Sequence, residues 1–109
     1  MNADIWCRTL TETSDSTLKT NIKPIQNGNL LKISKLKAYN FQWKADNSKK
    51  ENIGLLAQQV ERVFPEVIHV NDSTGLKSIA YTQLIPILID AINEQQINIQ
   101  EIEKQTVRL

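Results

Sequence analysis

Hydrophobic positions recur at helical spacing in two short stretches of the chain. Residues 27–36 open with an Asn-Gly-Asn turn and continue with apolar side chains three and four apart, which predicts a short helix over 27–35. Residues 57–64 repeat the pattern, and Pro65 ends this second predicted helix. The apolar positions of the two helices are Leu30, Leu31, Ile33, Leu36, Ala57, Val60, Val63 and Phe64.

Elsewhere the period of the pattern changes to two. Tyr39, Phe41 and Trp43 alternate with polar residues, which predicts a strand with one buried aromatic face. The same three rings could instead form a ligand-stacking surface, but alternating aromatic residues on a strand are more often part of a core. We therefore assign them to the core.

Two further patterns predict strands. Ile53 to Leu56 is a short apolar run that follows a polar loop, and it is read as a second strand. Later, two apolar runs flank a turn rich in Asn, Asp, Ser, Thr and Gly, which is typical of a β-hairpin. The hairpin strands are expected at 67–70 and 76–81, on either side of the turn 71–75.

The last part of the chain predicts one long helix, over about residues 82–106. Pro86 is expected near its start, where the missing N–H does little harm. Spacings of three and four link one row of mostly apolar residues, which we call the seam: Ile85, Leu88, Ile92, Gln95, Ile99, Ile102, Thr106 and Leu109.

This helix implies a partner. About 24 residues after Pro86 would reach roughly 36 Å, more than so small a body covers, and an isolated amphipathic helix is only marginally stable. Isoleucine at both seam positions favours three or four chains over two, and Gln95 could fix the register. The alternative is a helix that folds back on its own domain. We predict an α+β fold: a small, mostly helical domain with short strands and a β-hairpin, ending in a helix that forms a homotrimeric coiled coil.

Composition sets further limits. The 109 residues, 40% hydrophobic and 23% charged, suffice for one small domain. A net charge of +1 gives no overall field that would recruit nucleic acid or an anionic membrane. No apolar run approaches the roughly 20 residues that cross a bilayer, and no signal-peptide pattern opens the chain, so we expect a soluble protein made in the cytoplasm. A nucleic-acid patch is improbable because acidic residues dilute its candidate lysines, Lys32, Lys35, Lys37, Lys49 and Lys50.

Cofactor chemistry has few candidates. Cys7 is the single cysteine and His69 the single histidine, which excludes an internal disulfide and leaves too few ligands for structural zinc. A cysteine-protease pair of Cys7 and His69 lacks an orienting third group, and His69 is expected to be a strand residue. We predict no metal and no cofactor.

The start of the chain carries the candidate chemistry. Residues 1–13 show no sustained period and look like the end of a larger preceding segment. From Ser14 the sequence reads SDSTLKTNI, in which clustered Ser, Asp and Thr suggest a turn or a helix cap, with Pro24 stopping any helix. The alternative is that this segment is a solvent-exposed helix cap whose lysine has no particular role.

At this point the sequence resembles the intramolecular chaperone auto-processing domain found at the C-termini of phage tail spikes and fibres and in the myelin regulatory factor. The family motif is Ser-Asp-x-Arg-x-Lys followed by Asn-Ile, and this chain supplies Ser14, Asp15, Lys19, Asn21 and Ile22, with Thr17 in place of the arginine. Further matches are YNFQWK, IGLLAQQVERVFPEV and KSIAYTQLIPILIDAI, so the resemblance covers roughly residues 14–96.

The resemblance implies a homotrimeric module, here residues 14–109, that helps an upstream phage fibre of the same polypeptide to fold. The module then cleaves the bond before the motif serine, Thr13–Ser14, and residues 1–13 would be the remnant of the fibre. It further implies a virion precursor assembled in the bacterial cytoplasm, with the module released after cleavage. The main alternative is a trimerisation and folding module of the same fold that does not cut.

The implied catalytic pair is Ser14 as nucleophile and Lys19 as general base, with Asp15 as possible support. An ordinary lysine is neutral in only about one molecule in 2,500 at pH 7, so Lys19 needs surroundings that disfavour its charge. Assembly of the trimer could supply them. The offset of five residues does not fit helical neighbours, so a turn must bring the two side chains together.

Overall fold

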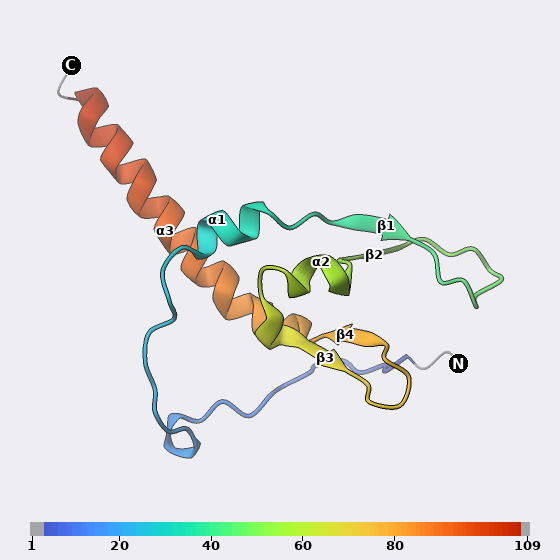
Figure 1. Ribbon diagram of the computed structural model, residues 1–109. Coiled ribbons are helices and arrows are strands. Elements are labelled where there is room, and N and C mark those ends of the chain that lie inside the picture. Colours follow the sequence, from blue (N-terminus) through green and yellow to red (C-terminus); the bar gives the residue numbers. More distant parts are fainter. Residues whose placement is uncertain (1–3, 108–109) are drawn as a thin grey trace.

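The computed structural model describes residues 4–107 (Figure 1). It is an α+β structure with short antiparallel strand pairs and a long C-terminal helix, as the sequence predicts. Two 3₁₀ turns, η1 (Ser16–Leu18) and η2 (Pro65–Val67), accompany the regular elements. These are α1 (Asn29–Ser34), β1 (Tyr39–Phe41), β2 (Asn52–Gly54), α2 (Ala57–Glu61), β3 (Ile68–Val70), β4 (Lys77–Ile79) and α3 (Tyr81–Val107).

The predicted turn at the start of α1 is confirmed. Gly28 caps the helix with a φ of 94°, in the left-handed region that glycine enters without steric cost. Asn29 is the buried polar residue of α1, with 3% of its surface exposed, and its side chain contacts α3. The turn thus fixes the point at which the N-terminal segment joins the domain.

Each pair of strands forms its own small sheet. β1 pairs with β2 in the register Tyr39 to Gly54, and β3 pairs with β4 in the register Ile68 to Ile79. The polar turn of the second hairpin is held by Asn71, whose side chain accepts from two backbone N–H groups and whose carbonyl accepts from Gly75. The predicted hairpin is confirmed, but Tyr81, expected at the end of its second strand, begins α3.

The hydrophobic core is small and lies where α2, η2 and α3 meet. Its five buried members are joined by partly buried side chains from α1 and the β3–β4 hairpin, Ile33 and Ile68 among them. On α3 the inward residues fall three apart along one stripe, which Ala91 extends. The buried cluster consists of Val60, Phe64, Val67, Leu84 and Ile87.

The predicted buried aromatic face is wrong for Trp43. This side chain is 60% exposed and meets Phe41 edge to face, while Tyr39 and Phe41 are half-buried. The reason is that β1 ends at Phe41 and its sheet has two strands, so no second layer covers the end of the row. Phe41 and Trp43 instead line an open apolar hollow beside Ile53 and Leu56.

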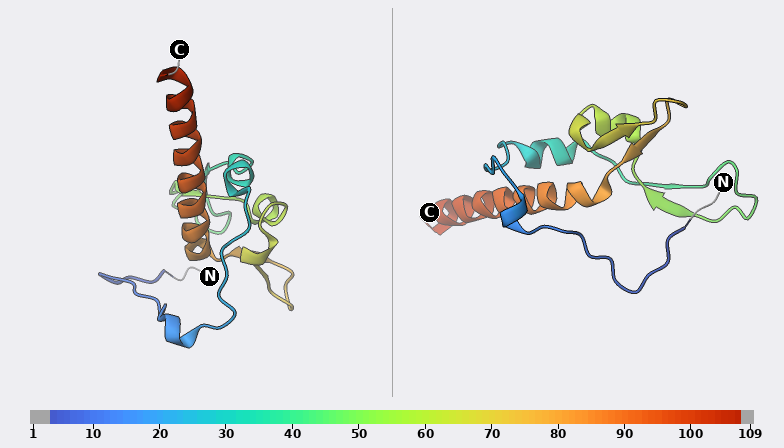
Figure 2. Two further views of the ribbon diagram at one scale, coloured as in Figure 1. Left: turned by 90° about the vertical axis from the view of Figure 1, so that its left-hand side faces the viewer. Right: turned by 90° about the horizontal axis from the view of Figure 1, so that it is seen from below.

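α3 projects from the domain, and its predicted extent is confirmed within a residue at each end. Beyond its contact with α1, the C-terminal half of α3 projects away from the domain, and residues 95–106 are exposed throughout (Figures 1 and 2). Pro86 is the sixth residue of α3, further in than expected, so the carbonyl of Thr82 loses its helical donor. The last expected seam residue, Leu109, lies outside the described residues.

The described part of the chain is elongated rather than compact. Its radius of gyration is 18.4 Å, against about 13 Å for a compact domain of this length. Two segments account for this: the outer half of α3 and the N-terminal arm, residues 4–27, which loops away from the domain in both Figure 1 and Figure 2. Every residue of this arm is exposed.

Candidate active site

A single 3₁₀ turn shapes the candidate catalytic segment. Asp15 caps η1, and its Oδ1 accepts from the Thr17 N–H at 2.9 Å and from the Thr17 hydroxyl at 2.8 Å. The backbone closes behind it, because the amides of Leu18 and Lys19 donate to the carbonyls of Asp15 and Ser16. Short polar side chains favour this capped turn, as the sequence pattern indicated.

The turn brings Lys19 onto Ser14. The ammonium Nζ of Lys19 donates to the Oγ of Ser14 at 2.7 Å, across the five-residue offset. This contact is the geometry that a nucleophile and its base require. The expected turn is therefore present, and the two side chains singled out from the sequence lie within direct hydrogen-bond reach.

Asp15 faces Thr17 and supports the turn. The backbone N–H of Thr17, and then its hydroxyl, stabilise the charged carboxylate and hold the pKa of Asp15 below its ordinary value of 3.8. Neither ion pair found among residues 4–107 involves Asp15 or Lys19. Thr17, at the position where the motif has arginine, thus fixes the carboxylate by hydrogen bonds.

Asn21 turns the chain away after the Ser14–Lys19 pair. Its φ of 54° lies in the left-handed region, which asparagine tolerates better than most residues. Residues 22–28 then form no helix or strand and lead to the start of α1 (Figure 1). An asparagine two residues after the lysine therefore has a conformational reason.

Exposed apolar side chains flank the pair along the chain. Leu18 is 75% exposed and Ile22 is 70% exposed, on either side of Lys19 along the chain. Upstream of the Thr13–Ser14 bond, Ile5, Trp6 and Leu10 are exposed as well. One copy of the chain therefore presents the site on a solvent-facing arm with no covering layer.

The seam on α3 is exposed too. Leu84, Ile87 and Ala91 face the domain, while the seam lies about a quarter-turn further round the helix. Its apolar members are all more than two-fifths exposed, so folding back on the domain does not use this row. These members are Ile85, Leu88, Ile92, Ile99 and Ile102, and the polar Gln95 and Thr106 are exposed with them.

Other sequence candidates are placed apart from this site. Cys7 is exposed in the arm, and His69 lies in the middle of β3, as the strand pattern predicts. Within residues 4–107, no three His, Cys, Asp or Glu side chains gather in a way that would hold a metal ion. Over the same residues, no helix combines the length and apolar character of a membrane span.

The anchoring of α1 to α3 was missed by sequence reasoning. Asn29 Nδ2 donates to Asp90 Oδ2 at 2.9 Å, and the amide of Leu30 donates to Glu94 Oε2 at 3.1 Å. Asp90 and Glu94 are one helical turn apart and meet the N-terminus of α1, where carboxylates are favoured. Two acids at that spacing on an otherwise apolar face are a weak signal that could have indicated the contact.

The sequence profile of a peptidase family described as "chaperone of endosialidase" matches residues 14–69, which is just over half of the chain. The match begins at Ser14, the residue that carries the Lys19 contact. The chain belongs to the chaperone of endosialidase family.

Similar proteins include long tail fiber proteins Gp37 of phages. That of Enterobacteria phage Ox2 is 32% identical over 108 residues, covering 93% of this chain and 41% of the relative. That of Salmonella phage S16 is 32% identical over 113 residues, 96% of this chain and 15% of the relative. That of Enterobacteria phage M1 is 32% identical over 97 residues, 83% of this chain and 38% of the relative. This chain therefore spans well under half the length of these proteins.

Proposed function

We propose that this chain is the C-terminal chaperone module of a phage tail fibre, which assembles as three copies, aids folding of the preceding segment and then cuts the Thr13–Ser14 bond. The observation that carries the proposal is the Lys19 Nζ to Ser14 Oγ contact of 2.7 Å. Family membership and the tail-fibre names of the similar proteins support the assignment to a phage tail fibre. The module would be released during virion assembly in the bacterial cytoplasm.

Association proceeds through α3. The seam is mostly apolar, is exposed, and continues past the domain. Copies of the same helix would cover it. Rows of isoleucine at both seam positions favour more than two chains. Three parallel copies would also bring three arms and three upstream segments to one end of the assembly, where a trimeric fibre begins.

The cutting step uses groups already in contact. A neutral Lys19 amine takes the proton of the Ser14 hydroxyl, and Oγ attacks the Thr13 carbonyl carbon. The C–N bond then breaks, the Ser14 nitrogen receives the proton from Lys19, and an ester joins Thr13 to Oγ. Water hydrolyses the ester and leaves residues 14–109 with Ser14 as the new N-terminus.

Assembly would control this step through the charge of Lys19. Leu18 and Ile22 are exposed in one copy and would be covered against a neighbour. Lys19 lies between them in the sequence, so the same contact would remove water from its ammonium group and favour the neutral amine. Cutting is then delayed until the fibre has been brought together.

A non-cleaving folding module with an idle Ser14 is the second candidate. Thr17 favours it, because a threonine supplies no second cation to disfavour the charge on Lys19. The two functions share the fold and the seam, and they differ in the fate of one peptide bond.

Intact mass after folding separates them. The full chain should yield two fragments, 1–13 and 14–109, whereas Ser14→Ala and Lys19→Ala should keep the full mass. Lys23→Ala, an exposed lysine of the same arm, is the matched control and should be cut like the parent chain. Cutting in Ser14→Ala would refute the mechanism, and a parent chain that associates but stays whole would establish the non-cleaving module.

A further inference from the structure

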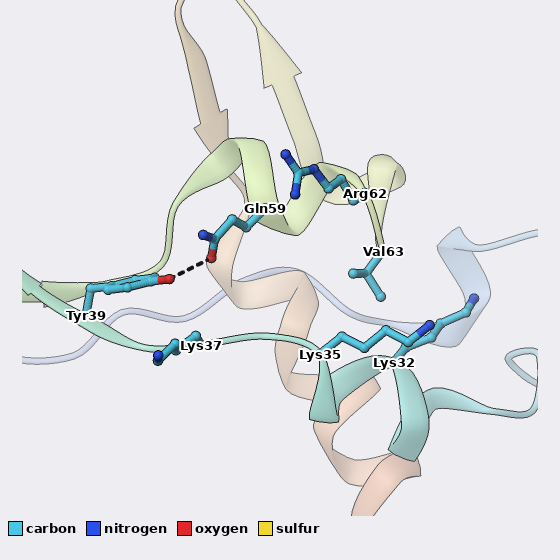
Figure 3. A pocket seen from close by; sticks show the side chains of 7 residues that line it. All are labelled: Lys32, Lys35, Lys37, Tyr39, Gln59, Arg62 and Val63. Atoms are coloured by element: carbon cyan, nitrogen blue, oxygen red, sulfur yellow. Dashed lines mark hydrogen bonds between the residues drawn. The ribbon is translucent and has the colours of Figure 1, made fainter.

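A second hollow, of about 590 Å³, lies between the end of α1, β1 and α2 (Figure 3). Three lysines line one side of it, and Gln59 of α2 and Arg62, which directly follows α2, line the other. Sequence reasoning considered these lysines as an improbable nucleic-acid patch diluted by acidic residues. The fold adds Arg62 and makes a concave site of four cationic side chains: Lys32, Lys35, Lys37 and Arg62.

These four cations have no carboxylate partner among residues 4–107. The two ion pairs in that part of the chain join Lys77 to Glu61 and Lys104 to Glu101. Glu61, the neighbour of Arg62 in the sequence, is thus engaged with β4. Lys32 is half-buried, with its Nζ 5.8 Å from the centroid of the Phe64 ring. An anion inside the hollow would supply the counter-charge that these four side chains lack among the described residues.

The wall of the hollow also holds an oriented amide. The Tyr39 hydroxyl donates to Gln59 Oε1 at 3.1 Å, drawn as the dashed line in Figure 3. That bond occupies the oxygen of the carboxamide and leaves its N–H₂ group free to donate. Charged and neutral donors therefore line the same space.

We infer that this hollow binds a small polyanion that carries adjacent phosphate groups. Arginine offers a planar fork to phosphate oxygens, and lysines add point charges around it. A single carboxylate would leave most of the four cations without a counter-charge. This site shares no residue with the Ser14–Lys19 pair and does not depend on cutting.

The test is a titration of the ¹⁵N-labelled full chain with inorganic pyrophosphate at low ionic strength, with sodium chloride at matched ionic strength as the reference. Saturable NMR shifts are expected at the Gln59 side-chain amide and at the backbone amides of Tyr39 and Arg62. The variant Lys35→Gln/Arg62→Gln should bind at least about tenfold more weakly. Lys44→Gln/Lys50→Gln removes two cations outside the hollow and should bind like the parent chain.

Two results would overturn the assignment. Shifts that do not saturate, or that weaken equally in both double variants, would mean general charge attraction. If pyrophosphate fails to bind and Lys35→Gln/Arg62→Gln instead reduces the mass measured by light scattering, the hollow holds an acidic segment of a second copy.

Discussion

Asn29 and Asp90 lie 61 residues apart in the sequence, and the side-chain amide of the first donates to the carboxylate of the second at 2.9 Å. The same amide group also donates to the carbonyl of Gln26, at the end of the N-terminal arm. One buried side chain therefore joins the arm, α1 and the long helix. Together with the bond from the Leu30 amide to Glu94, this side chain attaches the arm to α3.

Asn29→Ala should destabilise the domain by about 2 kcal/mol, because it leaves two partly buried acceptors without their donor. Chemical denaturation followed by circular dichroism measures the change. Asn47→Ala, in an exposed turn, is the control and should stay within about 0.5 kcal/mol of the parent chain. Equal stability of the two variants would remove Asn29 from this linking role.

A polar change in the seam should separate association from folding. Ile92→Asn and Ile99→Asn each place a polar amide where neighbouring copies would bury an isoleucine. Each change should remove about 2 kcal/mol of the stabilisation gained on association. Light scattering should show the mass falling towards that of one chain at concentrations where the parent has the mass of the proposed trimer. Asn93→Asp, on the opposite side of α3, should leave the mass unchanged. A parent chain that is already monomeric at high concentration would rule out the proposed trimer.

The capped turn should respond to pH through Asp15. Its pKa is held below 3.8 in the folded turn, so the stabilisation is present above that value and is lost as the pH falls through the lowered pKa. Thr17→Val removes the hydroxyl donor and should move the Asp15 pKa upwards, while the backbone donor remains. Carboxyl-carbon NMR titration of both chains reports the two values. An unchanged titration would show that the hydroxyl contact is absent in solution.

Gly54 is required by close packing. A Cβ at this position would lie 3.0 Å from the Phe41 ring and 3.0 Å from the Tyr81 hydroxyl, which accepts from the Leu55 amide at 2.9 Å. Gly54→Ala should therefore cost about 1–2 kcal/mol by pushing the ring and the hydroxyl apart. Thermal unfolding measures it. Adding Tyr81→Phe removes one of the two obstacles, so the cost of the alanine should be smaller in that background.

The sequence alone predicted most of the local structure and named the candidate site residues. The spacing of the isoleucines, three and four residues apart, predicted α3, because a helix places residues at that spacing on one face. The turn before α1 and the hairpin turn at 71–75 were predicted from asparagine and glycine, which accept a left-handed backbone conformation. Ser14 and Lys19 were named from residue type and motif, since few side chains can serve as nucleophile and base.

Tertiary structure decided which of these residues meet. Only the fold showed that the η1 turn joins Lys19 to Ser14, that Leu84 and Ile87 rather than the seam face the domain, and that Trp43 lacks a covering layer. It also brought Asp90 to Asn29 and placed Arg62 in the same hollow as Lys32, Lys35 and Lys37. Such contacts depend on how elements pack across long stretches of chain, whereas periodicity records only which face of an element is apolar.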